Sequence, residues 1–133
     1  MSLPTSTLIQ TISFGTPSGA YNGYSTTWYS DSIYGPGYYG YSPGLVTVAY
    51  YASAFISNIT QAFVGDMNLQ GTLAQNPQDS DWVDISSTLV GNMDPNNATP
   101  IATSMNATGN FTYLRVKVSN FSSGNIVKVQ VNY

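Results

Sequence analysis

The sequence predicts an all-β fold, an antiparallel jelly-roll-like β-sandwich formed by a single domain over residues 1–133. Three observations favour this fold. Charged residues make up only 7% of the chain, against about 25% in an ordinary soluble domain, so that polarity comes from Ser, Thr, Asn and Gln, which suit strands and turns. Short segments alternate apolar and polar residues with a period of two. Apolar residues do not recur at helical spacing over three turns.

The N-terminal part divides into a strand and a long aromatic segment. Residues 7–14 (TLIQTISF) are expected to form the first strand. Residues 15–44 contain few aliphatic residues and many Gly, Pro, Ser and Tyr, most densely in YGPGYYGYSPG at 34–44. Gly and Pro disfavour a regular helix or a central strand there, whereas disordered segments are usually poor in aromatic residues. We therefore expect a long Tyr/Gly-rich N-terminal loop region or arm that lies against the sandwich or a neighbour.

Residues 44–133 are expected to form the main sandwich. Alternation in FTYLRVKVSNF and GNIVKVQVNY predicts two strands, and the turn formers at 122–125 predict that they form a β-hairpin over 111–133. Further strands are predicted at 44–55, 65–73 and 82–86, with a loop at 74–81 and a long surface loop at 91–109. The inner faces of these strands predict a core of Met67, Leu69, Trp82, Ile85, Leu114, Val116, Val129 and Val131. Among them Trp82, which begins a strand after an acidic loop, is interpreted as a core anchor rather than a ligand platform.

The composition leaves little catalytic chemistry. The chain contains no His, Cys or Glu, so the usual general base, thiol nucleophile and imidazole ligand are missing. Asp79, Asp81 and Asp84 form the one acidic group, for which a glycosidase pair, a calcium site and turn capping are the alternatives. Turn capping is favoured, because the glycine and final glutamate of an EF-hand loop are absent. We expect no enzyme activity, no cofactor and no bound metal.

Charge also limits the partners. The net charge is −3 with three basic residues, which argues against nucleic acid, since phosphate binding needs clustered Lys and Arg. No apolar run reaches the length of about 18 residues that a transmembrane helix needs, and the N-terminus lacks the basic region of a signal peptide. Arg115 is expected to point away from the core and to pair with Asp81 or Asp84. So little charge is well tolerated where neighbours cover the surface, which favours assembly.

Two stretches carry a resemblance to a known group of proteins. MNLQGTLAQNPQDSDWVDI (67–85), followed by GNFTYLRVKVSNFSSGNIVKVQVNY (109–133), resembles a pattern in small virion structural proteins of tailed bacteriophages, especially T-even-like phages of marine cyanobacteria. There a strand ending in Gly-Thr-Leu or Gly-Ser-Leu leads through a loop to Asp-Trp and a short strand. A later strand contains aromatic-x-Leu/Ile/Val-Arg, and a terminal hairpin closes the domain. Their "YYG" element before a "TV" strand is matched at Tyr38, Tyr39, Gly40, Thr47 and Val48. The resemblance covers residues 37–133, and residues 1–36 match no such pattern.

The strand arrangement is also similar to discoidin-like and galactose-binding-like sandwiches, in which a loop precedes a Trp strand and an Arg lies in a late strand. This resemblance implies a jelly-roll-type fold and does not imply sugar binding.

The phage resemblance implies a non-enzymatic virion structural protein, made in the host cytoplasm and located on the particle surface. It would be an accessory subunit, homo-oligomeric or present in many copies, that binds other virion proteins such as major capsid, neck or tail proteins. Capsid decoration is favoured over a neck or tail position. The alternative is a carbohydrate- or host-surface-binding module of a phage tail or fibre. Aromatic residues are enriched at interface cores, and the expected contact residues are Trp28, Tyr34, Tyr38, Tyr39 and Tyr41.

Overall fold

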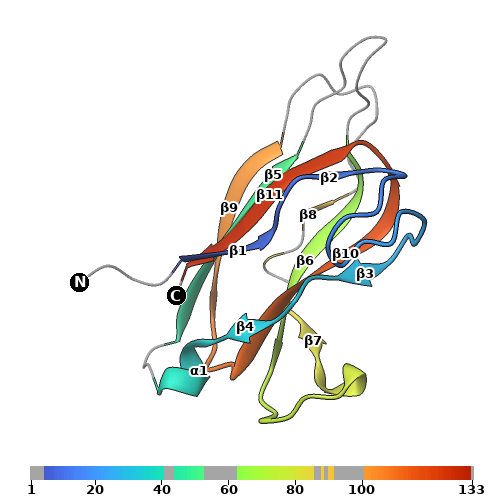
Figure 1. Ribbon diagram of the computed structural model, residues 1–133. Helices are drawn as coiled ribbons and strands as arrows, with labels where there is room; N and C mark the ends of the chain where they lie inside the picture. The colour runs from blue at the N-terminus through green and yellow to red at the C-terminus, as the bar shows by residue number, and fades with distance from the viewer. Residues whose placement is uncertain are drawn as a thin grey trace.

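The computed structural model describes residues 5–40, 44–52, 63–85, 88, 90–91 and 101–132. Two antiparallel sheets pack face to face (Figure 1), so the predicted all-β, jelly-roll-like sandwich is confirmed. The first sheet has the order β1-β11-β5-β9, with β2 also pairing with β11; its strands are β1 (Thr5–Ile9), β2 (Ile12–Ser13), β5 (Leu45–Ala52), β9 (Ile101–Thr108) and β11 (Asn125–Asn132). In the second sheet, of order β3-β10-β6-β7, β4 also pairs with β10 and β8 with β6; its strands are β3 (Trp28–Tyr29), β4 (Ile33–Tyr34), β6 (Val64–Thr72), β7 (Val83–Asp84), β8 (Val90–Gly91) and β10 (Tyr113–Ser123).

The core lies between the sheets and follows the predicted alternation. On β5, Val46, Val48, Tyr50 and Ala52 are buried while the residues between them are partly or fully exposed. Six of the predicted core residues have no exposed surface, and Ile85 packs against them from the margin. Complete burial of a Leu or Val side chain contributes roughly 1.5–3 kcal/mol. The six are Met67, Leu69, Leu114, Val116, Val129 and Val131.

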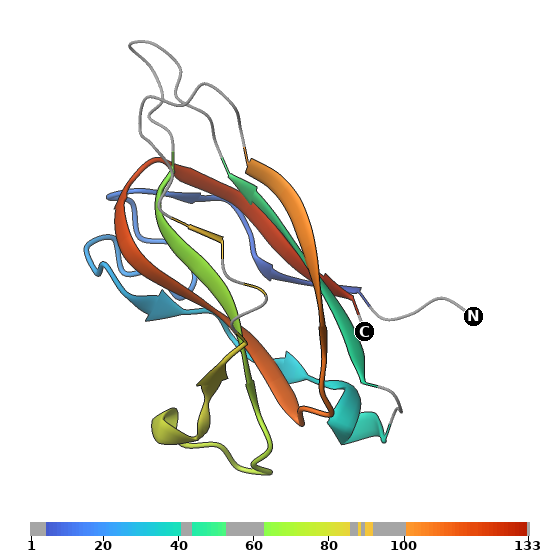
Figure 2. The same cartoon turned by 180° about the vertical axis from the view of Figure 1, so that it is seen from behind.

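The predicted hairpin over 111–133 is wrong, because β10 and β11 belong to different sheets. The chain passes from one layer to the other at Gly124, whose φ of +86° is readily available to glycine. Figure 2 shows the chain curving over one end of the sandwich between the two strands. The alternation of apolar and polar residues shows that each strand has an apolar face. Because the strands of both sheets turn their apolar faces inward, this alternation does not reveal to which sheet a strand belongs.

Two predicted loops contain regular structure. The segment 15–44 includes β3, β4 and one turn of helix, α1 (Pro36–Tyr39), and both strands pair with β10. The segment 91–109 includes β9, which pairs with β5 along its whole length. The alternation in IATSMNAT is weak, because Ala and Thr occur on both faces of the strand, and the Asn and Pro residues just upstream predict a loop.

The other boundaries differ by a few residues. The first predicted strand is divided into β1 and β2, and β7 is shorter than predicted. The ends of the predicted 44–55 and 82–86 strands and Tyr133 fall outside the described residues. Within the part of the chain that the structure describes, no helix has the length and apolar character to cross a membrane.

Candidate functional site

The strand β4, the helix α1 and the start of β10 meet at one end of the sandwich (Figure 1), and four tyrosines from these elements lie in mutual contact. Tyr34 lies on β4, Tyr38 and Tyr39 on α1, and Tyr113 on β10, where it is paired with Tyr34. We call these four residues the tyrosine cluster. Three of the predicted contact residues therefore lie together, and Tyr113, which is not among the predicted contact residues, completes the group.

Backbone contacts fix the position of α1. The N–H of Gly35 donates to Thr112 O and the N–H of Gly37 to Phe111 O, both at 2.8 Å. The backbone approaches so closely that a Cβ atom at either glycine would collide with the backbone of residues 110–111. Pro36 is compatible with the first helical position, and Gly40 ends the turn in the left-handed conformation, with φ of +75°. The Gly and Pro residues that disfavour a long helix thus form this single turn.

The rings of the tyrosine cluster contact one another while remaining accessible. Tyr34 and Tyr38 stack with ring centroids 3.9 Å apart and planes 12° apart. Tyr39 meets both rings nearly perpendicularly, and the Tyr113 ring centroid lies 5.4 Å from that of Tyr34. Tyr34, Tyr38 and Tyr39 keep 43%, 51% and 46% of their surface exposed. The close Tyr34 hydroxyl, through electrostatic repulsion first and a hydrogen bond second, raises the pKa of Tyr38 above its ordinary value near 10, so Tyr38 is neutral at pH 7.

An open cleft of about 390 Å³ lies next to the tyrosine cluster. Its walls combine the rings of Tyr38 and Tyr113 with the side chains of Gln75 and Asn76, both of which are exposed. Among the described residues, none that lines the cleft is charged. Rings beside uncharged hydrogen-bonding groups suit either a peptide or a neutral saccharide.

The other predicted contact residues do not join this surface. Tyr41 lies outside the described residues. The prediction for Trp28 is wrong, because this side chain is only 5% exposed and packs in the core, 5.3 Å from the ring of Tyr21 and 6.4 Å from that of Phe121. Pairing with the buried Val118 on β10 turns Trp28 inward.

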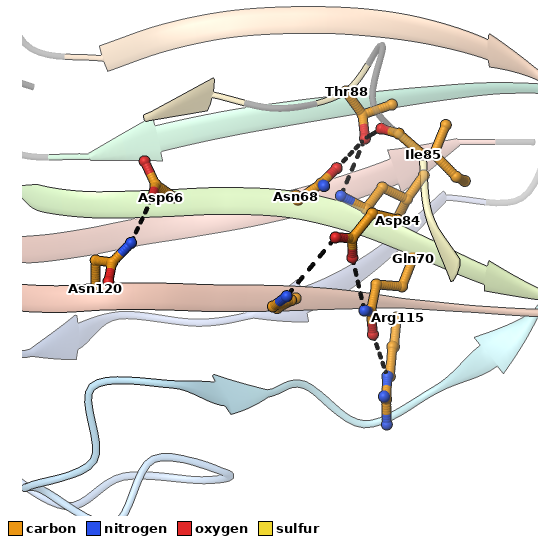
Figure 3. Close-up of polar contacts among 10 residues, drawn as sticks. Asp66, Asn68, Gln70, Asp84, Ile85, Thr88, Arg115 and Asn120 are labelled. Carbon is orange, nitrogen blue, oxygen red and sulfur yellow. Dashed lines mark hydrogen bonds and ion pairs between the residues drawn. The ribbon is translucent and has the colours of Figure 1, made fainter. Parts of the chain in front are cut away.

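The prediction that Trp82 anchors the core is also wrong. Trp82 is half-buried and lies outside the core cluster. Its ring faces Arg115, whose guanidinium carbon lies 4.3 Å from the Trp82 ring centroid and 4.0 Å from that of Tyr29. The Nε of Arg115 donates to Gln70 Oε1 at 2.8 Å (Figure 3). Burial lowers the pKa of Arg115, which nevertheless stays protonated. Trp82 thus covers the outer face of the second sheet by stacking on a cation.

The carboxylates of the acidic loop act separately. Asp84 accepts a hydrogen bond from Gln70 and pairs with Lys117 at 3.7 Å, so Arg115 reaches Asp84 through Gln70 rather than directly (Figure 3). Asp81 accepts from the backbone N–H of Gln78 at 2.8 Å and closes a one-turn 3₁₀ helix over Asp79–Asp81, which confirms turn capping. Among the residues that the structure describes, no three carboxylates gather in a metal-binding group.

Comparison with known proteins adds fold likeness alone. No protein-family profile and no curated protein matches the chain. Among solved structures it is similar to an exo-β-1,3-galactanase from Phanerochaete chrysosporium (TM-score 0.38, 13% identity), in an alignment covering 98% of this chain and 26% of the galactanase. It is also similar to the C-terminal CBM6 of a marine laminarinase from Zobellia galactanivorans (TM-score 0.40, 16% identity), with 99% and 93% of the two chains covered. At these values the likeness carries no argument about a ligand.

Proposed function

We propose that this protein is a non-enzymatic structural subunit of a tailed-phage particle, an accessory protein that binds neighbouring virion proteins through the tyrosine cluster. The observation that carries the proposal is the arrangement of the cluster, in which rings from β4, α1 and β10 contact one another at an exposed end of the sandwich. Capsid decoration remains the favoured position, because small single-domain sandwiches suit surface sites that occur in many copies.

Protein contact accounts for the geometry of the cluster. Tyrosine provides a large contact area with few rotatable bonds, and buried aromatic anchors dominate the binding energy of interfaces. Because the rings already hold one another in place, little side-chain entropy remains to be lost on binding. Their neutrality means that a partner covers them without desolvating a charge.

The phage assignment rests on the sequence resemblance over residues 37–133. The parts of that pattern meet in one structural unit. Gly71, at the end of β6, provides the space in which the Phe111 ring lies, and the N–H of Thr112 donates to Thr72 O at 2.8 Å. The Trp of the Asp-Trp element stacks on Arg115 of the late strand. These contacts bring residues that are far apart in the sequence pattern together in one part of the second sheet, which supports reading the pattern as a whole.

The test is incorporation into phage particles. A variant with Tyr34→Ser, Tyr38→Ser and Tyr39→Ser should stay folded, because its residues lie outside the core, and its copy number in purified particles should fall at least tenfold. Tyr24→Ser, at a separate residue that is 80% exposed, is the matched control and should incorporate normally. Normal incorporation of the triple variant, or absence of the wild-type chain from particles, would overturn the proposal.

A second candidate function, binding of a neutral saccharide, is favoured by the cleft beside Tyr38 and Tyr113. Aromatic rings stack on the C–H faces of sugars, and the amides of Gln75 and Asn76 are placed to hydrogen-bond hydroxyl groups. Glycan-array binding that disappears in a Gln75→Ala, Asn76→Ala double variant, together with normal particle incorporation of that variant, would select this function. Absence of array binding by the wild-type chain would reject it.

A further inference from the structure

The four edges of the two sheets differ in length and regularity. At the edges of the second sheet, β3, β4, β7 and β8 have two residues each. On one edge of the first sheet, β1 has five residues and its pairing with β11 is interrupted by a register shift. On the other edge, β9 has eight residues in unbroken register with β5 (Figure 1). Among the described strands, β9 is thus the longest and most regular edge.

The backbone of β9 presents a row of hydrogen-bonding groups away from β5. The N–H of Gly109 donates to Gly44 O at 2.8 Å, one step beyond the Thr108–Leu45 pair. Hydrogen-bonded and non-hydrogen-bonded residue pairs alternate along an antiparallel ladder. The bond from Gly109 therefore identifies every second residue of β9 as bonded to β5, and the backbone groups of the residues between them face outward. The outward N–H and C=O groups belong to Ala102, Ser104, Asn106 and Thr108, whose side chains are all exposed.

The usual protection against edge pairing is missing on β9. Edge strands are commonly blocked by charged side chains, proline or a bulge. Neither β9 (IATSMNAT) nor its neighbour β5 (LVTVAYYA) contains a charged residue or proline, and no bulge interrupts their pairing. Among the described strands, the one charged residue of the first sheet is Lys128 on β11, whereas the second sheet carries Asp66, Asp84, Arg115 and Lys117.

We propose that β9 is a self-association edge, where a second copy of this chain adds its own β9 antiparallel across a two-fold axis and joins the two five-stranded sheets. Antiparallel pairing of identical strands is what a two-fold axis generates. Two copies meet without like-charge repulsion because the strand is uncharged, and the small Ser, Thr and Asn side chains are able to hydrogen-bond across the new pair. This interface is separate from the tyrosine cluster and does not depend on the proposed function.

The expected dimer is weak in isolation. Pairing of one eight-residue strand buries less than the roughly 1,200–2,000 Å² of a stable interface. A dissociation constant in the micromolar to millimolar range is therefore expected, and many copies held on one surface strengthen such a contact through their high local concentration.

Sedimentation velocity over a concentration series tests the proposal. Wild-type protein should show a concentration-dependent dimer. Ser104→Lys, which places a charge at the edge, and Ser104→Pro, which removes an outward N–H without removing a bond to β5, should both remain monomeric with unchanged thermal melting. The matched control is Thr5→Lys on the opposite edge, which should dimerise like wild type. The triple tyrosine variant should also dimerise, which separates this proposal from the previous one.

Cysteine scanning then locates the two-fold axis. The chain contains no cysteine, so single substitutions at each residue from 102 to 107 introduce one thiol. In an antiparallel pair about a two-fold axis, one residue faces its own copy at a distance that suits a disulfide. Oxidative dimer formation should peak at one part of β9 and stay low in Thr5→Cys. A monomeric wild type at millimolar concentration, a flat scan, or pairing of β9 only with a different protein would overturn self-association.

Discussion

The segment 15–40 supplies aromatic residues to two regions with opposite environments. Tyr21 and Trp28 enter the core, where they pack with Phe121 at centroid distances of 5.3 and 6.4 Å. The tyrosine cluster, supplied largely by residues 34–39, stays half exposed at the end of the sandwich. The two groups have similar composition and both contain ring–ring contacts, so composition does not decide where an aromatic residue of this segment lies.

Register with β10 decides it instead. Trp28 lies opposite Val118, and Ile33 opposite Leu114; both β10 residues are fully buried. The alternate residues of β3 and β4 lie opposite Lys117 and Tyr113 and point outward with them. Each short strand therefore takes its inward and outward faces from the alternation of β10.

Long strands with alternating residues are predictable from the sequence, whereas short strands and stacked side chains are not. The alternation of β5, β6, β10 and β11 is visible in the sequence, and it predicted the sandwich and six of the eight core residues correctly. A two-residue strand such as β3 leaves no periodic pattern, so the sequence does not reveal that Trp28 faces the core. The role of Trp82 depends on Arg115, 33 positions away in the sequence, whose stacking requires the fold to be known.

The largest expected effect is on the free energy of unfolding, and it should differ between the two tryptophans. Trp28→Ala should lower the free energy of unfolding by about 3–5 kcal/mol, because it removes a large ring from the core. Trp82→Ala should cost less than half as much, since it removes one face of a half-buried cation–π stack. Urea denaturation at pH 7 measures both values. Trp28→Phe should be milder than Trp28→Ala, because it retains a ring and removes an indole N–H that has no partner among the described residues. Equal losses for Trp28→Ala and Trp82→Ala would show that burial does not separate the two residues.

The next effect concerns a buried tyrosine outside both aromatic groups. Tyr50 is fully buried on β5, and its hydroxyl donates to Thr88 O at 2.8 Å. The Oγ1 of Thr88 in turn lies 2.8 Å from Asn68 Oδ1 (Figure 3) and accepts from the N–H of Leu69 on β6, so Thr88 links the two sheets. Tyr50→Phe should cost about 1–3 kcal/mol at pH 7, because it leaves a buried carbonyl without its donor.

The pH dependence of that residue follows from its burial. Burial raises the pKa of Tyr50 above the ordinary value near 10. The folded state therefore holds this proton more tightly than the unfolded state, and the stabilisation is complete below pH 10 and is lost as the pH rises through the folded-state pKa. Unfolding free energies measured from pH 8 to 11 should fall less steeply above pH 10 in Tyr50→Phe than in wild type. Parallel curves would indicate that Tyr50 titrates normally.

The smallest expected effect is a change in the pKa of Tyr38. The pKa of Tyr38 is raised, like that of Tyr50, but for a different reason. The first cause at Tyr38 is the neighbouring Tyr34 rather than burial. Tyr34→Phe should therefore bring the pKa of Tyr38 back toward its ordinary value without a measurable loss of stability. Added salt should act in the same direction, because exposed charges are screened beyond about 10 Å at 0.1 M ionic strength and more strongly at 1 M. NMR titration of the Tyr38 ring at low and high salt measures the shift, with Tyr50 as the internal control that salt should leave unchanged. A Tyr38 shift that persists in Tyr34→Phe and at 1 M salt would mean that the cluster is covered rather than exposed, and the contact-surface interpretation would lose its basis.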